Sequence, residues 1–217
     1  AGFAERFPYS REAIMPIDAY SPCPGGSGKK IKHCSCCRDI VSDLEHIVKA
    51  LEGGQRVAAL DRINRTLATH ANRPSLLSLK AATQLSLQEM QGFDETVAAF
   101  LQVASSNPLA LAYGSLSKLK RGDVDAAVDD LQAALANVES EIPRDMYETV
   151  GAVARALLDT GKYAAARAHY VMQLAMSGNE DERAIKAVLG MGSPEQIPPM
   201  LKQDRSFPPC PAGVRRY

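Results

Sequence analysis

The sequence predicts an all-α protein, an array of helical hairpins with a small zinc-binding loop, or zinc knuckle, near the N-terminus. Three observations support this prediction. Apolar residues recur at helical spacing from about residue 39 to residue 177. Segments that begin with glycine and continue with small residues repeat along this stretch. Four of the 5 cysteines, in contrast, lie between positions 23 and 37, in a polar, glycine-rich loop where a packed core does not need them.

The composition excludes several classes of protein. The 25 basic and 25 acidic residues balance, so no overall charge points to nucleic acid, to acidic substrates or to a membrane surface. No apolar run approaches the roughly 20 residues of a membrane span. Residues 1–20 have no hydrophobic centre and predict a tail, not a secretory signal. We therefore expect a cytoplasmic protein with free thiols. Because the chain begins with Ala1 and not with Met, a fragment of a longer protein is also an expectation.

Residues 21–38 carry the predicted knuckle. Cys23 and Cys34 lie far enough apart for the loop between them to wrap around one ion, and the cysteines that follow can supply further thiolates from one turn. Tetrahedral Zn²⁺ takes four such ligands, at about 2.3 Å from each sulfur. Nearby basic side chains would offset part of the thiolate charge and lower the thiol pKa values. The predicted ligands are Cys23, Cys34, Cys36 and Cys37, with His33 as an alternative ligand. The basic residues are Lys29, Lys30, Lys32 and Arg38.

The knuckle resembles a known family. Residues 22–34, PCPGGSGKKIKHC, are similar to the SEC-C zinc motif, whose usual form is CxCGSGKKYKxC followed by Cys or His. That motif ends the bacterial translocase ATPase, where it docks a partner chaperone, and it is appended to many other bacterial proteins. Cys23 and Cys34 match two of its ligands, but Gly25 and Ser35 stand at the other two ligand positions, and the cysteines at 36 and 37 are the candidates to replace them. The resemblance, over about a tenth of the chain, implies a bacterial protein that binds a protein partner.

Other interpretations of this segment differ in strength. A phosphate-binding loop for nucleotides needs Ser or Thr directly after its lysine, but Lys30 follows Lys29 here, so this interpretation fails. A disulfide framework suits a secreted domain, and the adjacent Cys36 and Cys37 are poorly placed to pair with each other. A catalytic thiol needs a base held in fixed geometry, and His33 is the one histidine beside the cluster. A degenerate motif that has lost its metal and persists as a basic loop is the main alternative.

Residues 39–177 predict successive amphipathic helices, with boundaries at glycine or proline. The second of them is expected to place Val57, Leu60, Ile63 and Leu67 on one apolar face. The expected helix boundaries are, in order, an end at Gly53–Gly54, a helix over about 55–70, a helix from Pro74 to about Gly92, a helix that ends before Asn107–Pro108, and four further segments to about Ser177.

Four segments open alike, with a glycine turn at Gly54, Gly92, Gly122 and Gly161 followed by alanines at the same phase. They resemble the second helix of tetratricopeptide repeats. The glycines stand 38, 30 and 39 residues apart, whereas that family repeats about every 34 residues, and the chain has no tryptophan. The resemblance implies an array whose concave surface receives peptides or proteins. The alternative is a closed, irregular helical bundle.

Residues 178–217 predict one last helix, a further helix start at Ser193-Pro194, and a proline-rich extended segment. Cys210 lies in this segment and is interpreted as a free thiol. The helical region offers isolated histidines and solvated acidic pairs, which do not predict an enzyme. Helical phase does not decide whether polar residues line a groove; the residues considered are Gln84, Gln88, Tyr113, Ser117 and Lys118.

These patterns together predict a cytoplasmic adaptor that binds Zn²⁺ and recognises a protein or peptide partner through the helical-repeat surface and the basic residues Lys29, Lys30 and Lys32. No membrane association and no small-molecule substrate are expected. One alternative is nucleic-acid binding through the same basic loop, although no aromatic residue for base stacking lies between Cys23 and Cys37. The other is the accessory region of a larger enzyme.

Overall fold

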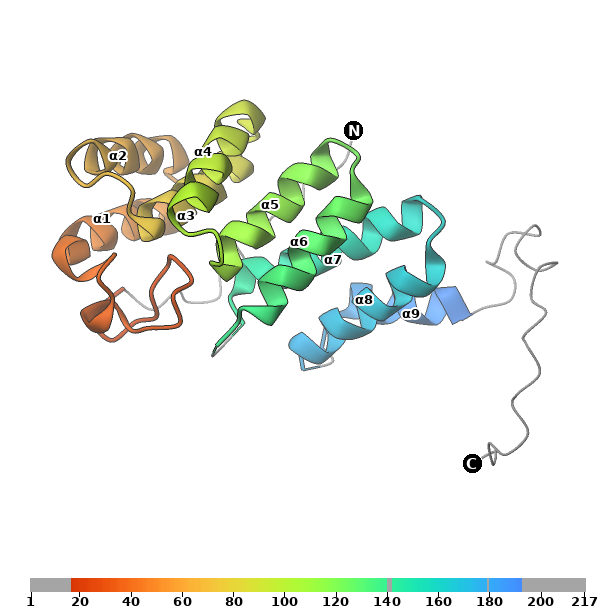
Figure 1. Cartoon of the computed structure of the whole chain (residues 1–217). Coiled ribbons are helices and arrows are strands. Elements are labelled where there is room, and N and C mark those ends of the chain that lie inside the picture. Colours follow the sequence, from red (N-terminus) through yellow and green to blue (C-terminus); the bar gives the residue numbers. More distant parts are fainter. Residues whose placement is uncertain (1–16, 140–141, 179, 193–217) are drawn as a thin grey trace.

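The computed structural model describes residues 17–139, 142–178 and 180–192. Within this part of the chain every long element is a helix, and the one β-type pairing is an isolated bridge in the knuckle. The predicted all-α array of hairpins is therefore confirmed (Figure 1). The predictions made for Ser193-Pro194 and Cys210 lie outside the described residues.

The α-helices follow one another with short turns (Figure 1). Two short 3₁₀ helices, Ile31–His33 and Arg38–Ile40, precede them in the knuckle. The α-helices are α1 (Val41–Glu52), α2 (Arg56–Thr69), α3 (Pro74–Leu87), α4 (Met90–Val103), α5 (Pro108–Lys120), α6 (Val124–Ala136), α7 (Arg144–Asp159), α8 (Tyr163–Met176) and α9 (Glu182–Gly192).

Neighbouring helices pair into hairpins, α1 with α2, α3 with α4, α5 with α6, and α7 with α8, and α9 packs on α8. Each hairpin also contacts the next, and α5 contacts both α3 and α7. The first helices α3, α5 and α7 therefore lie side by side in one layer. The edge-to-face ring pair of Phe93 and Tyr113, with centroids 6.1 Å apart, joins α4 to α5 within this packing. None of the described helices is both long and apolar enough to cross a membrane.

Three of the four predicted glycine turns are present, and the fourth is wrong. Gly54, Gly122 and Gly161 have φ of 71°, 81° and 78° in the turns between the two helices of a hairpin, a conformation that favours glycine. Gly92, in contrast, lies inside α4, and α3 ends at Leu87 with Gln88 in the left-handed region at φ 63°. A Cβ at position 92 would lie 2.5 Å from Nε2 of Gln84. This glycine therefore lies in a close helix–helix contact and not in a turn, and a larger residue would displace the side chain of Gln84.

The predicted apolar face of α2 is also corrected at one position. Leu60 and Ile63 are buried, but Val57 is 64% exposed. At 3.6 residues per turn, Val57 points about 120° away from Ile63, which lies at the centre of the buried face. A valine in the first turn of this helix therefore contributes little to the core.

Candidate metal centre

The backbone of the knuckle (residues 21–38) folds back on itself. Pro22 and Lys30 form an antiparallel bridge, the N–H of Cys23 donates to the carbonyl of Lys29 at 2.9 Å, and the N–H of Ile31 donates to that of Ser21 at 2.9 Å. Gly26 turns the loop between them with φ 70°. This closure returns the chain from Cys23 to the second group of cysteines.

The second group forms one turn. The N–H of Cys37 donates to the carbonyl of Cys34 at 3.1 Å, so the sulfurs of Cys34, Cys36 and Cys37 face the sulfur of Cys23. The four Sγ atoms lie within 4.8 Å of one another, and the shortest separations are 3.1–3.5 Å. A tetrahedral ion with bonds of about 2.3 Å places its sulfurs roughly 3.8 Å apart. Small side-chain rotations therefore convert this cluster into a metal site.

All four sulfur-bearing residues are buried, with exposed fractions of 0–8%. Two groups of the loop are hydrogen-bonded to them: the N–H of Gly25 donates to Sγ of Cys23 at 3.3 Å, and the hydroxyl of Ser27 lies 3.3 Å from Sγ of Cys34, where either group can be the donor. Such hydrogen bonds stabilise thiolates and orient ligands. The cysteines are free thiols at these separations, well beyond the roughly 2.05 Å of a disulfide bond.

The thiols share their protons unequally. Hydrogen bonds from Cys36 and Cys37 hold the pKa of Cys23 well below its ordinary value. The pKa values of Cys36 and Cys37 are raised, mainly by their hydrogen bonds to Cys23 and further by burial. A cation beside the sulfurs would stabilise the added negative charge and favour deprotonation of Cys36 and Cys37. A divalent ion that prefers sulfur fits this donor set.

The other predicted site residues lie outside the sulfur cluster. His33 is exposed, and its ring is not among the ligand atoms that lie close together. An ion at this site would therefore be bound by the four sulfurs without the histidine. Lys29, Lys30 and Lys32 are exposed. The ammonium of Lys32 lies 3.8 Å from the ring centroid of Tyr20, a cation–π contact.

The knuckle is docked on the first turns of α3 and α5 (Figure 1). The hydroxyl of Ser75 donates to the carbonyl of Cys36 at 2.8 Å, and the side-chain amide of Asn107 donates to the carbonyl of Gly25 at 2.7 Å. The guanidinium of Arg73 donates to the carbonyl of Ser35. Sequence analysis gave these residues no role beyond the helix boundaries at Pro74 and Asn107–Pro108, because their partners lie far away along the chain.

The knuckle contacts α3 and α5 most closely at Gly25 and Gly26. A Cβ at Gly25 would lie 2.7 Å from the backbone N of Ser75, and one at Gly26 would lie 2.8 Å from Cγ of Leu109. The cysteines share one core cluster with apolar residues of α1, α2 and α3. An ion bound here would therefore join the loop and the hairpins into one unit. The apolar residues include Ile31, Ile40, Leu44, Ile47, Ile63, Leu76 and Leu79.

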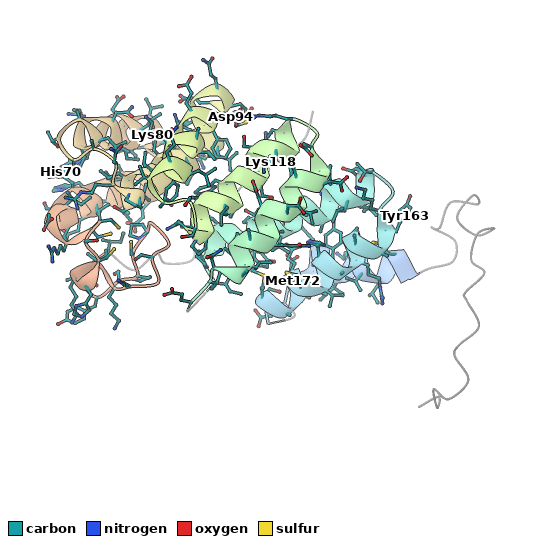
Figure 2. The ribbon with its side chains drawn as sticks, viewed as in Figure 1. His70, Lys80, Asp94, Lys118, Tyr163 and Met172 are labelled. Atoms are coloured by element: carbon teal, nitrogen blue, oxygen red, sulfur yellow. The ribbon has the colours of Figure 1, made fainter. Side chains whose placement is uncertain are left out.

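The polar residues considered as groove residues mostly connect helices instead. Gln84 accepts a hydrogen bond from Thr96 at 2.7 Å, and Ser117 donates to Asp94 at 2.5 Å. Lys118 pairs with Asp130 at 2.7 Å. Figure 2 shows Asp94 and Lys118 toward the end of α5 that lies away from the knuckle. They stabilise hairpin packing at a distance from the sulfur cluster.

Asp145 provides a pH-dependent contribution to stability. Burial raises its pKa, and the hydroxyl of Tyr113, which donates to the carboxylate, opposes this effect only in part. The native state therefore binds a proton more readily than the unfolded state, whose Asp has a pKa of about 3.9. As the pH falls from neutral toward about 4, the wild type should gain stability relative to Asp145→Asn, by up to about 1.4 kcal/mol per pH unit. Urea unfolding of both proteins across this range measures the difference. A difference that is constant, or that changes in the opposite direction, contradicts the prediction.

Comparisons of the chain with protein-family models, with curated proteins and with solved structures gave no match. The similarity of residues 22–34 to the SEC-C motif therefore stays a prediction from the residues themselves.

Proposed function

We propose that this protein is a zinc-binding adaptor. One structural Zn²⁺ is held by the four cysteines of the knuckle, and the surface made by the knuckle and the hairpins recognises a protein or peptide partner. The observation that carries the proposal is the convergence of four buried sulfurs in a loop that is hydrogen-bonded to the starts of two helices.

The donor set supports zinc in a structural role. A closed, four-sulfur tetrahedral arrangement is typical of structural zinc and of iron–sulfur centres, and structural zinc uses four protein ligands. With all four positions taken by Cys23, Cys34, Cys36 and Cys37, the ion would have no position for water or substrate, which supports an adaptor and not an enzyme. Reduced thiols of this kind suit a cytoplasmic compartment.

The scaffold supports recognition of a partner. The first helices α3, α5 and α7 lie side by side in one layer, and in solenoid proteins such a layer provides an extended binding surface. The resemblances to the SEC-C motif and to tetratricopeptide repeats imply the same kind of role. The exposed Lys29, Lys30 and Lys32 add a basic edge beside this layer.

The metal is tested by element analysis of protein purified under reducing conditions without added metal. We expect about one zinc per chain, as for a closed four-cysteine site. Native mass spectrometry of the same sample should show one bound ion and the loss of the four thiol protons. Iron in place of zinc contradicts the assignment of the metal. A metal content near zero that does not change after reduction and zinc addition contradicts the metal centre itself.

A further inference from the structure

A cleft of about 670 Å³ lies between the knuckle and the layer of first helices. Its floor is made by Leu79 and Ala82 of α3 and by Leu109 of α5. The knuckle loop, with Lys29 and Lys30, forms one wall, and the start of α7 forms the opposite wall. The cleft is therefore bounded both by the knuckle and by the array, and its volume is in the range that binds ligands.

The charged groups of this cleft are mainly basic. Lys29 and Lys30 are exposed, and neither forms an ion pair with a carboxylate among the described salt bridges, although Asp18 lies close enough to Lys30 to interact with it electrostatically. Arg144 lies on the opposite wall and interacts electrostatically with Asp145, the one carboxylate of the lining. Asp145 also accepts a hydrogen bond from Tyr113, and burial raises its pKa. The exposed Lys29 and Lys30 therefore favour an anionic ligand on the knuckle side of the cleft.

The floor, in contrast, is apolar. Its side chains are those of Leu79, Ala82 and Leu109, of which Leu79 and Leu109 are 8% and 4% exposed, and Ile142, which is 45% exposed, also lines the cleft. A ligand that covers this floor needs an apolar side chain between its acidic groups. Single-stranded nucleic acid needs aromatic faces for its bases. The one aromatic residue of the lining is Tyr20, whose ring already lies against the ammonium of Lys32.

We infer that this cleft binds an extended acidic segment of a partner protein, with carboxylates against Lys29 and Lys30 and an apolar side chain over Leu79, Ala82 and Leu109. The inference deepens the proposed function, since it names the partner chemistry and the surface that recognises it. Because the loop that carries these lysines is held by the sulfur cluster, a bound metal should strengthen binding of the segment.

The test uses the full chain and a pool of fluorescein-labelled short peptides in which acidic residues flank one leucine, measured by fluorescence anisotropy. Two matched pools replace the acidic residues with lysine, or the leucine with glycine. We expect saturable binding of the acidic leucine pool and at least roughly tenfold weaker binding of both controls, which corresponds to 1.4 kcal/mol. Equal or tighter binding of the lysine pool overturns the inference.

Two pairs of variants locate the site. Lys29→Glu and Ala82→Arg should each weaken binding of the acidic pool about tenfold or more. Lys49→Glu on α1 and Ala58→Arg on α2, both exposed and outside the cleft, should leave binding unchanged. Circular dichroism checks that each variant is folded, and Lys29→Glu remains informative if Ala82→Arg is not, because Lys29 is exposed. Equal affinities within each pair overturn the inference.

Metal analysis and peptide binding together distinguish failure of the cleft inference from failure of the metal proposal. If the chain holds zinc but no peptide pool binds, the inference fails and the metal centre stands. If the chain lacks metal but the acidic pool binds and Lys29→Glu weakens that binding, the cleft stands and the metal proposal fails. A labelled oligouridine that binds at physiological salt and is sensitive to Lys29→Glu, with no binding of peptide, overturns the inference in favour of nucleic acid.

Discussion

Replacing Cys37 with serine is expected to abolish metal binding and to lower the melting temperature by roughly 10 °C or more. Cys37 is fully buried, and its sulfur lies 3.2 Å from that of Cys23. A serine hydroxyl is a poor replacement for a thiolate ligand, and it would add a buried polar group to an apolar core. Structural zinc contributes about 10–16 kcal/mol in small zinc-finger peptides. Even a loss of a few kcal/mol matters, because 1 kcal/mol shifts the melting temperature by about 2–4 °C in a protein of this size.

Metal content and thermal unfolding measure this effect together. The matched control is Cys210→Ser, which changes the one cysteine outside the cluster and should keep about one zinc per chain. A Cys37→Ser protein that retains the wild-type zinc content contradicts the four-cysteine site. A protein that loses zinc but keeps its melting temperature contradicts the structural role of the metal.

Gly25→Ala should separate the knuckle from α3 and destabilise the protein by about 1–3 kcal/mol. The added Cβ would lie 2.7–2.9 Å from backbone atoms of Pro74 and Ser75, and backbone cannot move aside as a flexible side chain can. The shift should also weaken the hydrogen bonds from Ser75 to Cys36 and from Asn107 to Gly25. Unfolding by urea measures the loss of free energy.

The control for this substitution is Gly54→Ala. Gly54 has φ 71°, but a Cβ there would meet nothing within 4 Å, so only backbone strain of about 1 kcal/mol is expected. Amide hydrogen exchange should show faster exchange in the knuckle for Gly25→Ala and not for Gly54→Ala. If Gly25→Ala is no more destabilising than Gly54→Ala, the close contact with α3 is not maintained in solution.

The sequence was sufficient to predict the helices and the sulfur cluster because both depend on local patterns. Helical periodicity and the bounding glycines and prolines indicated the hairpins, and the short spacing of Cys34, Cys36 and Cys37 indicated one turn of ligands. The two incorrect assignments have different causes. Val57 is exposed because of its angle on α2, which the helical period itself gives. Gly92 packs against the side chain of Gln84 of the preceding helix, a tertiary contact that has no signal in the local sequence.

The docking of the knuckle could not be predicted for the same reason. Neither Ser75 nor Asn107 carries a motif for binding a distant loop, since each also fits an ordinary helix start. The structure gives a physical reason why glycine stands at position 25. A side chain there would collide with α3, whereas Cys36 and Cys37 bring their sulfurs to the cluster from another turn of the chain.

The contact of Asn107 with Gly25 spans 82 positions of the chain. During synthesis, at about 5–20 residues per second, Gly25 of the cysteine-rich loop leaves the ribosome roughly 4–16 s before Asn107, its hydrogen-bond partner. The nascent thiols are therefore more accessible to oxidants and to competing metals during this interval than in the finished protein. The length of this interval is set by how quickly the third hairpin follows.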